Sequence, residues 1–232
     1  MKTIAIILAS GVGARLGLEI PKQFFELRGK TVLEHSIIAF HSHNKIDDII
    51  IVSHPDYISK VAEIIKQGNY TKVSQIIAGG KTRQKSASYG VNAILEKEAK
   101  VLIHDAVRPF VTKRIIDDCI NTLDYYKAVN VAIESSDTII EVDEENCIKS
   151  IPQRKFLKRV QTPQGFHLNI IKKAHELASH EENLSFTDDC GLVREFNLVQ
   201  IKVIKGEEFN IKITYPSDIK LAENIIDVCD KI

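Results

Sequence analysis

The chain has 232 residues, of which 44% are hydrophobic and 27% charged, and its 31 basic residues balance its 31 acidic ones. This composition is typical of a globular protein, and a zero formal balance excludes the broad positive field on which non-specific nucleic-acid binding depends. The apolar run from Ile4 to Ala9 is much shorter than the roughly 18 to 20 residues of a membrane span. The sequence therefore predicts a cytoplasmic protein that contacts neither nucleic acid nor membrane.

Short β-branched runs alternate with longer amphipathic segments over the first 134 residues. Strands are predicted at 4–8, 49–52, 73–77, 101–103 and 129–133, and helices at about 31–43, 56–67, 83–97 and 112–126. This alternation is typical of βαβ units, so we expect an α/β, Rossmann-like fold in which helices cover both faces of a mainly parallel sheet. Such a sheet binds its ligand beyond the carboxyl ends of its strands.

The rhythm changes after residue 134. Two short β-branched runs, 138–142 and 147–151, flank an acidic turn and predict a β-hairpin arm at about 134–150. Helices at about 167–180, 187–196 and 217–229 and strands near 198–204 and 210–214 are expected to complete the fold. Because no repeat, low-complexity tract or Pro/Gly-rich linker interrupts the chain, we expect one domain over residues 1–232.

A glycine-containing loop with two nearby cations follows the first predicted strand. Gly11 and Gly13 leave room for backbone N–H groups to turn toward an anion, which favours phosphate binding. Arg15 and Lys22 lie on or just after this loop, where they can neutralise the charge that grows on an α-phosphate as pyrophosphate departs. The segment therefore predicts chemistry at phosphorus.

Two nucleotide-binding patterns do not fit the glycine segments of this chain. The dinucleotide-binding pattern G-x-G-x-x-G is not met, because Gly11, Gly13 and Gly17 are spaced by one residue too many. A P-loop at 79–82 lacks its first glycine, since Gln75 stands there. A plain strand-to-helix turn stays open for the first loop taken alone.

Two further segments follow predicted strands. The segment 79–86, with two glycines and Ser86, can hydrogen-bond a base edge or can be a solvated helix start. Asp105 leaves the end of a buried strand, which makes it our candidate Mg²⁺ ligand in a phosphate site. The alternative is that Asp105 caps the next turn and pairs with Arg108. His104 is interpreted as a packed, hydrogen-bonded histidine.

Taken together, these motifs resemble the cytidylyltransferases that couple CTP to a polyol phosphate. The resemblance runs from LASGVGARLG and PKQF through GGKTRQKS, IHDAVRPFV and DTI to QTPQGF, TDD and NIKIT. It implies a nucleotidyltransferase fold, with CTP as co-substrate and Mg²⁺ as cofactor. In this family the hairpin arm interlocks with that of a second subunit, so the resemblance also implies a homodimer.

The resemblance assigns roles to individual positions. It places the nucleotide in contact with Ala9, Ser10, Gly11, Gly13, Gly80, Lys81, Ser86, Asp105 and Ala106. It gives the catalytic phosphate contacts to Arg15, Lys22 and Lys212. It gives the metal to Asp105 and the acceptor to Asp105, Arg108, Thr138, Arg154 and Thr162, some of them across the dimer interface.

Departures within the family bear on the acceptor. Ser10 stands where Ala or Gly is usual, and Lys81 where one branch carries Asp. Ile139-Ile140 replaces the Ile-Lys of the methylerythritol branch, and Ile151-Pro152-x-Arg154 is similar to the ribitol branch, although TDD also occurs in the former. We therefore expect CDP-ribitol formation from D-ribitol 5-phosphate, with 2-C-methyl-D-erythritol 4-phosphate as the alternative acceptor.

Two hypotheses come from other classes. A nicotinamide-dependent reductase would use the glycine loop for a dinucleotide, and NADPH binding tests it. A nucleotide sensor without turnover would keep the fold, but it has no need of both Arg15 and Lys22, which are aimed at a developing charge.

Overall fold

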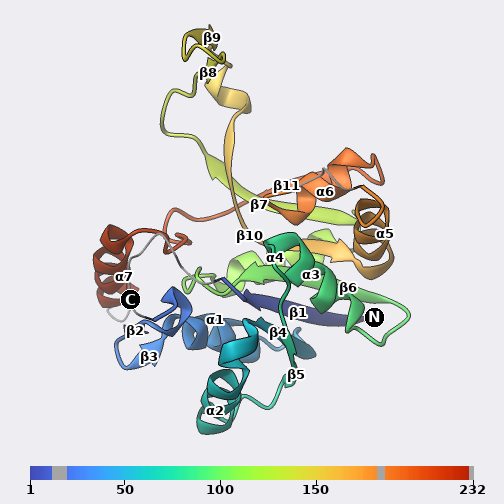
Figure 1. Ribbon diagram of the computed structural model, residues 1–232, viewed down its shortest axis with the longest axis vertical. Coiled ribbons are helices and arrows are strands. Elements are labelled where there is room, and N and C mark those ends of the chain that lie inside the picture. Colours follow the sequence, from blue (N-terminus) through green and yellow to red (C-terminus); the bar gives the residue numbers. More distant parts are fainter. Residues whose placement is uncertain (12–19, 182–185, 230–232) are drawn as a thin grey trace.

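The structure is a computed structural model that describes residues 1–11, 20–181 and 186–229. Within these residues a seven-stranded sheet has the order β11-β7-β10-β6-β1-β4-β5 (Figure 1). All pairs are parallel except those of β10, which runs antiparallel to both β6 and β7. The prediction of an α/β fold with a mainly parallel sheet is therefore confirmed.

The strands of the main sheet are short, and the central ones are apolar on both faces. They are β1 (Lys2–Ala9), β4 (Asp48–Ser53), β5 (Val73–Ala78), β6 (Ala99–Asp105), β7 (Ala128–Glu134), β10 (Lys158–His167) and β11 (Ile201–Lys205). Along β1, Ala5, Ile7 and Ala9 belong to one core cluster, whereas Ile4, Ile6 and Leu8 belong to another. This alternation is what a strand covered by helices on both faces requires.

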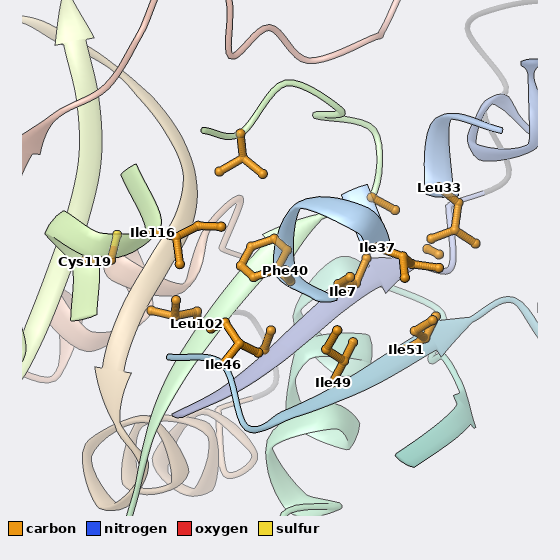
Figure 2. Packing of buried hydrophobic residues seen from close by; sticks show 14 of the residues in the cluster. Ile7, Leu33, Ile37, Phe40, Ile46, Ile49, Ile51, Leu102, Ile116 and Cys119 are labelled. Carbon is orange, nitrogen blue, oxygen red and sulfur yellow. The ribbon is translucent and has the colours of Figure 1, made fainter. Parts of the chain in front are cut away.

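Helices cover each face through one apolar stripe. One face carries α1 (Val32–His41), α2 (Ile58–Gly68) and α4 (Lys113–Thr122). The other carries α3 (Arg83–Asn92), α5 (Leu168–Ala178) and α6 (Asp189–Glu195). Figure 2 shows the first core, where Phe40 of α1 packs among Ile49 of β4, Leu102 of β6 and Ile116 of α4.

Smaller elements surround the sheet. A third cluster joins α7 (Pro216–Cys229) to the two-stranded ribbon of β2 (Glu26–Leu27) and β3 (Lys30–Thr31). Short 3-10 turns lie at η2 (Lys22–Phe24), η3 (Pro55–Tyr57) and η4 (Arg154–Phe156). Among the described residues, no helix is both long and apolar enough to cross a bilayer.

The predicted hairpin protrudes from the sheet as an arm, at the top of Figure 1. Its strands are β8 (Glu141–Val142) and β9 (Ile148–Ser150), which pair antiparallel and are shorter than predicted. Asp143 Oδ1 accepts hydrogen bonds from Glu145 N and Cys147 N and so closes the turn. The ends of β7 and β10 connect the arm to the sheet.

Three expectations were wrong in detail. The pattern predicts no strand at 158–167, where β10 lies, because Pro163 and Gly165 are uncommon inside strands. The register of β10 against β7 shifts between Gln161 and Gln164, and this shift accommodates Pro163. The segment 210–214, predicted as a strand, is irregular. It lies beside the turn after β6 instead of a strand, and Ile213 N donates one hydrogen bond to Val107 O in that turn. Helix α3 ends at Asn92 instead of 97.

Candidate active site

A cavity of about 690 Å³ opens at the carboxyl ends of β1, β4, β5 and β6. Parallel strands bring their last residues to one edge of the sheet, so segments distant in sequence meet there. Its wall consists of Leu8, Ala9, Ser10, Gly11, Lys22, Gln23, His54, Gly80, Lys81, Thr82, Arg83, Asp105, Val107, Thr187, Lys212 and Thr214. The structure thus brings together eight predicted site residues: Ala9, Ser10, Gly11, Lys22, Gly80, Lys81, Asp105 and Lys212.

The first loop is held by a glutamine that sequence reasoning missed as a site residue. Gln23 is buried, and its Nε2 donates to Ala9 O at 2.8 Å and to Gly11 O at 3.0 Å. These bonds fix the start of the loop and place the neighbouring Lys22 in the cavity wall. Gly13 and Arg15 lie outside the described residues, so their roles stay predictions.

The second loop begins α3 and touches the first. Thr82 caps the helix by accepting from Lys85 N at 3.1 Å. A Cβ on Gly79 would lie 2.4 Å from Ser10 Cβ, so only glycine allows this approach of the two loops. Gly80 and Lys81 line the cavity, whereas Ser86 is fully buried behind them. Ser86 therefore supports the loop and does not form part of the cavity wall.

Asp105 is the buried carboxylate of the site. Its Oδ1 accepts from Arg83 Nε at 3.1 Å and its Oδ2 from Lys212 Nζ at 2.7 Å. Burial alone would raise the pKa of Asp105, but the positive charges of Arg83, Lys212 and Arg108 outweigh it and hold the pKa well below its usual range. Asp105 is thus ionised, and it fixes two cations at the cavity wall.

The alternative of an Asp105–Arg108 pair is not what the hydrogen bonds show. Arg108 donates to the carbonyl oxygens of Asn210 at 2.8 Å and Val160 at 3.3 Å, and it does not line the cavity. Burial lowers the pKa of Arg108, although Asp105 opposes this effect. Ala106, also predicted to contact the nucleotide, is fully buried, and its N–H donates to Leu8 O.

Arg83 connects the site to helix α6, a connection that sequence reasoning missed. Arg83 NH1 donates to Asp189 Oδ2 at 2.8 Å, and Asp189 is buried. Burial would lower the pKa of Arg83, but Asp189 and Asp105 raise it. The signal was present, since Arg83 lies in GGKTRQKS and Asp189 in TDD, two motifs that carry the family resemblance.

The start of α6 is itself fixed by β10. Gln164 Oε1 accepts from the N–H groups of Asp189 and Cys190, at 2.9 and 3.1 Å, and Gln164 Nε2 donates to Asp188 Oδ2 at 2.6 Å. Asp188 caps the helix by accepting from Gly191 N. The QTPQ and TDD motifs are therefore joined, and together they position Asp189 against Arg83.

Thr162 and His104 form a buried pair beneath Asp105. Thr162 Oγ1 accepts from Asp105 N at 3.1 Å and lies 3.0 Å from His104 Nδ1, while His104 Nε2 lies 3.0 Å from Arg108 O. Burial lowers the pKa of His104 to about 4, despite the nearby Asp105. The interpretation of His104 as a packed, hydrogen-bonded residue is confirmed, and Thr162 lies behind the cavity wall, not in it.

Two predicted acceptor residues lie in the arm or just after it, outside this cavity. Thr138 is exposed, and Arg154 lines a separate hollow of about 410 Å³ with Glu134, Ser135, Gln153 and Lys155. Arg154 NH1 donates to Ser136 O at 3.3 Å. One copy of the chain therefore does not bring the predicted acceptor residues of the arm to the predicted nucleotide residues.

A divalent cation would find few protein ligands here. Among the described residues, no three His, Cys, Asp or Glu side chains gather as a metal-binding group. Mg²⁺ in nucleotide sites is commonly held by one or two carboxylates and by substrate phosphates. The ionised Asp105 at the cavity wall fits that arrangement. A cation bound there would compete with Lys212 for Asp105 Oδ2, and the Lys212 side chain is 41% exposed.

Comparisons with known proteins identify the family of the chain. The sequence model of the family described as IspD, 2-C-methyl-D-erythritol 4-phosphate cytidylyltransferase, matches residues 3–228. A protein of that name from Thermobifida fusca is 37% identical over 97% of this chain and 93% of its own length. The bifunctional ribulose 5-phosphate reductase/CDP-ribitol pyrophosphorylase of Haemophilus influenzae is 41% identical over 97% of this chain and 48% of its own length.

A solved structure of the same family has the same fold. The crystal structure of 4-diphosphocytidyl-2C-methyl-D-erythritol synthase from Anaerococcus prevotii superimposes with a TM-score of 0.87 at 31% identity, covering 97% of this chain and 96% of that one. The match includes the sheet, whose carboxyl edge forms the cavity. The chain therefore belongs to the 2-C-methyl-D-erythritol 4-phosphate cytidylyltransferase family, and it is a cytidylyltransferase that acts on a polyol phosphate.

Proposed function

We propose that the protein transfers CMP from CTP to D-ribitol 5-phosphate, giving CDP-ribitol and pyrophosphate. The main support is sequence identity. The chain is 41% identical to the ribulose 5-phosphate reductase/CDP-ribitol pyrophosphorylase, but 37% and 38% identical to the methylerythritol enzymes of Thermobifida fusca and Clostridium botulinum. The Ile151-Pro152-x-Arg154 segment supports the same acceptor through its similarity to the ribitol branch.

The reaction needs no covalent enzyme intermediate. An oxygen of the acceptor phosphate attacks the α-phosphorus of CTP, the bond to the bridging oxygen of the β-phosphate breaks, and the electron pair leaves with pyrophosphate. Because the attacking oxygen is already anionic near neutral pH, the protein's tasks are placement and charge neutralisation. Lys22 and Lys212, both at the cavity wall, are assigned to the phosphates, and Arg15 is expected to join them.

Asp105 is proposed to hold Mg²⁺ together with phosphate oxygens of CTP. When bound, the ion would neutralise part of the charge on the triphosphate. Arg83 has a separate task in this proposal, which is to keep Asp105 in place through its contacts with Asp105 Oδ1 and Asp189 Oδ2. The cavity wall therefore supplies a fixed carboxylate, whichever acceptor is used.

The arm is proposed to complete the site in a homodimer of this single-domain chain. Its Thr138 and Arg154 are assigned to the acceptor phosphate bound at the cavity of the other copy. Exposed apolar side chains support such a contact, because in the described residues of one chain Ile139, Ile140, Val142 and Ile148 of the arm, and Ile151 just after it, are 42–61% exposed. In this arrangement a monomer binds CTP but holds the acceptor poorly.

A second acceptor is favoured by a separate observation. The family that matches residues 3–228 carries the name of the 2-C-methyl-D-erythritol 4-phosphate enzyme, as does the relative from Thermobifida fusca. Both acceptors are sugar-alcohol phosphates, and the mechanism above is the same for each. The choice between them separates cell-surface polymer synthesis from isoprenoid precursor synthesis.

Pyrophosphate release tests the proposal. The purified chain is incubated with CTP, Mg²⁺ and either D-ribitol 5-phosphate or 2-C-methyl-D-erythritol 4-phosphate at matched concentrations. We expect the kcat/KM for ribitol phosphate to exceed that for the methylerythritol phosphate by at least about tenfold, the effect of a single specific contact. The reverse preference would assign the second function, and no release with either would overturn both acceptor assignments.

A further inference from the structure

Lys212 of the cavity wall lies on an irregular segment, 210–214, and not on a strand of the sheet. Its Nζ donates to Asp105 Oδ2 at 2.7 Å, while 41% of its side chain is exposed. A long, partly exposed side chain has several rotamers available to it. The position of the Lys212 ammonium group therefore depends on how firmly the backbone beneath it is held.

The backbone after Lys212 is held by main-chain hydrogen bonds. Ile213 N donates to Val107 O at 2.9 Å. Thr214 N and Tyr215 N both donate to Asp218 Oδ2 at 2.7 Å, in the first turn of α7. These bonds fix the chain on one side of Lys212, and the chain on the other side needs an anchor of its own.

Asn210 provides that anchor two residues before Lys212. It is fully buried, and its Nδ2 donates to Thr162 O at 2.9 Å and to Gln161 Oε1 at 3.3 Å. The pairings of β10 with β6 and β7 leave out Thr162 and Pro163, so the carbonyl oxygen of Thr162 is left for a partner outside the sheet. The register shift in β10 thus supplies the acceptor that Asn210 uses.

Thr162 also contacts the residue that holds the Lys212 ammonium group. Its Oγ1 accepts from Asp105 N at 3.1 Å, while its carbonyl oxygen accepts from Asn210. Asp105 Oδ2 in turn accepts from Lys212 Nζ. The contacts form a closed circuit, in which Thr162 fixes both the backbone before Lys212 and the acceptor of the Lys212 side chain.

We propose that Asn210 is a positioning residue for nucleotidyl transfer, which holds Lys212 in place by tying segment 210–214 to Thr162. The inference rests on the proposed phosphate role of Lys212. Asn210 does not line the cavity, so it acts through Lys212 and not on a substrate. Without the tie the segment can shift, and a displacement of about 1 Å at a group that positions the substrate can lower the rate about 100-fold.

A double-mutant cycle with Lys212 tests this role in the full chain, with pyrophosphate release as the assay. Asn210→Ala removes the side-chain amide but keeps the bond from Arg108 NH1 to the backbone oxygen of residue 210. We expect it to lower kcat/KM for CTP at least about tenfold. In a Lys212→Met chain the same change should lower kcat/KM less than about twofold further, because no ammonium group is left to position.

Equal losses in the two backgrounds would show that Asn210 only supports the fold, and they would overturn the proposal. If Asn210→Ala does not fold, Asn210→Ser takes its place in the cycle. Its side chain keeps a donor in the buried site, but it is one bond shorter than that of asparagine and so loses the tie to Thr162.

Asn69→Ala is the matched control for lost stability. Asn69 ends α2 with φ at +51°, in the left-handed region that alanine disfavours, and it lies outside the cavity wall. The change should lower the midpoint of denaturant unfolding and leave kcat/KM unchanged. A loss of activity comparable to that of Asn210→Ala would trace the effect to stability and contradict a positioning role.

Failure of the inference is distinguishable from failure of the proposed function. If neither polyol phosphate releases pyrophosphate, calorimetric binding of CTP to the same chains forms a cycle that needs no acceptor. Asn210→Ala should then raise the Kd for CTP about threefold in the otherwise unchanged chain and leave it unchanged in the Lys212→Met chain. If Lys212→Met turns over CTP as the unchanged chain does, Lys212 has no phosphate role and Asn210 has no positioning role.

Discussion

The cavity and the arm are built in opposite ways. Side chains at the cavity are held by partners from distant parts of the same chain: Asp105 by Arg83 and Lys212, and Arg83 by Asp189. The arm makes a two-stranded hairpin of its own, and its Ile148 and Ile151 are 61% exposed. One chain therefore suffices to hold the cavity side chains in place, while apolar side chains of the arm stay exposed among the described residues.

This difference predicts that substitutions in the two regions affect different substrates. The family resemblance assigns the nucleotide to the cavity and the acceptor phosphate to the arm, so changes at the cavity should affect turnover and folding together. Changes in the arm should affect the acceptor alone. Four substitutions, from the largest expected effect to the smallest, and one mixing experiment can sharpen or break this separation.

Lys22→Ala should have the largest effect on activity. If Lys22 stabilises charge that appears on the α-phosphate in the transition state, kcat falls about 1,000-fold while the Kd for CTP rises less than about fivefold. Single-turnover kinetics and calorimetry measure the two quantities. Lys30→Ala, in the exposed ribbon, serves as the control. Equal losses in turnover and in CTP binding would contradict a transition-state role.

Asp189→Asn tests whether the contact between Asp189 and Arg83 holds the cavity wall in place. The change removes one of the two carboxylate partners of Arg83, and because Asp189 is buried we expect a loss of about 3 kcal/mol of unfolding free energy. Denaturant unfolding measures the loss. The matched control is Asp118→Asn, whose exposed pair with Arg114 contributes at most about 0.5 kcal/mol. Similar losses in the two variants would show that the Arg83 contact does not stabilise the fold.

His104 makes the stability of the cavity depend on pH. Its pKa is about 4 in the fold because of burial, below the ordinary value of 6.5, so the unfolded chain binds the extra proton as the pH falls. This contribution is fully present above pH 6.5 and is lost toward pH 4, which removes about 3 kcal/mol of unfolding free energy. His104→Gln should show a correspondingly weaker pH dependence, measured by denaturant unfolding from pH 7 to 4. An unchanged slope would mean that His104 is protonated in the fold.

Arg154→Ala tests the arm. Loss of a charge-assisted contact to the acceptor phosphate should raise the KM for the acceptor about 10- to 100-fold and leave that for CTP unchanged. Arg159→Ala, which removes a cation of β10 paired with Glu208, is the control. Steady-state kinetics with each substrate varied separately reads both constants.

Mixing the two impaired variants, at an acceptor concentration well below the raised KM of Arg154→Ala, shows which copy's cavity the arm reaches. A dimer of one Arg154→Ala chain and one Lys22→Ala chain holds an intact arm beside an intact cavity only if the arm reaches across the interface. We therefore expect activity to return when the two are refolded together. Activity that stays absent after mixing would place the arm and the cavity of one chain in the same site.

Much of the architecture was predictable because it depends on local pattern. The alternation of Ile4, Ile6 and Leu8 with Ala5 and Ile7 indicates a two-sided strand, and the acidic turn at 143–146 indicates a hairpin. Both loops of the cavity were also predictable, because glycines that directly follow a predicted strand are a local pattern. Strand β10 was missed because Pro163 and Gly165 mask its pattern, and only pairing with β6 and β7 makes it a strand.

The sequence by itself determined the order of the elements, the two glycine loops, the arm and the set of residue types suited to a nucleotide and a phosphate. Those features depend on neighbours along the chain. The tertiary structure alone decided that Asp105 faces Arg83 and Lys212, that Asp189 supports Arg83, and that Ser86 is buried while Ser10 is partly exposed. Such pairs join residues up to 107 positions apart, and no local pattern encodes which partners a sheet edge will bring together.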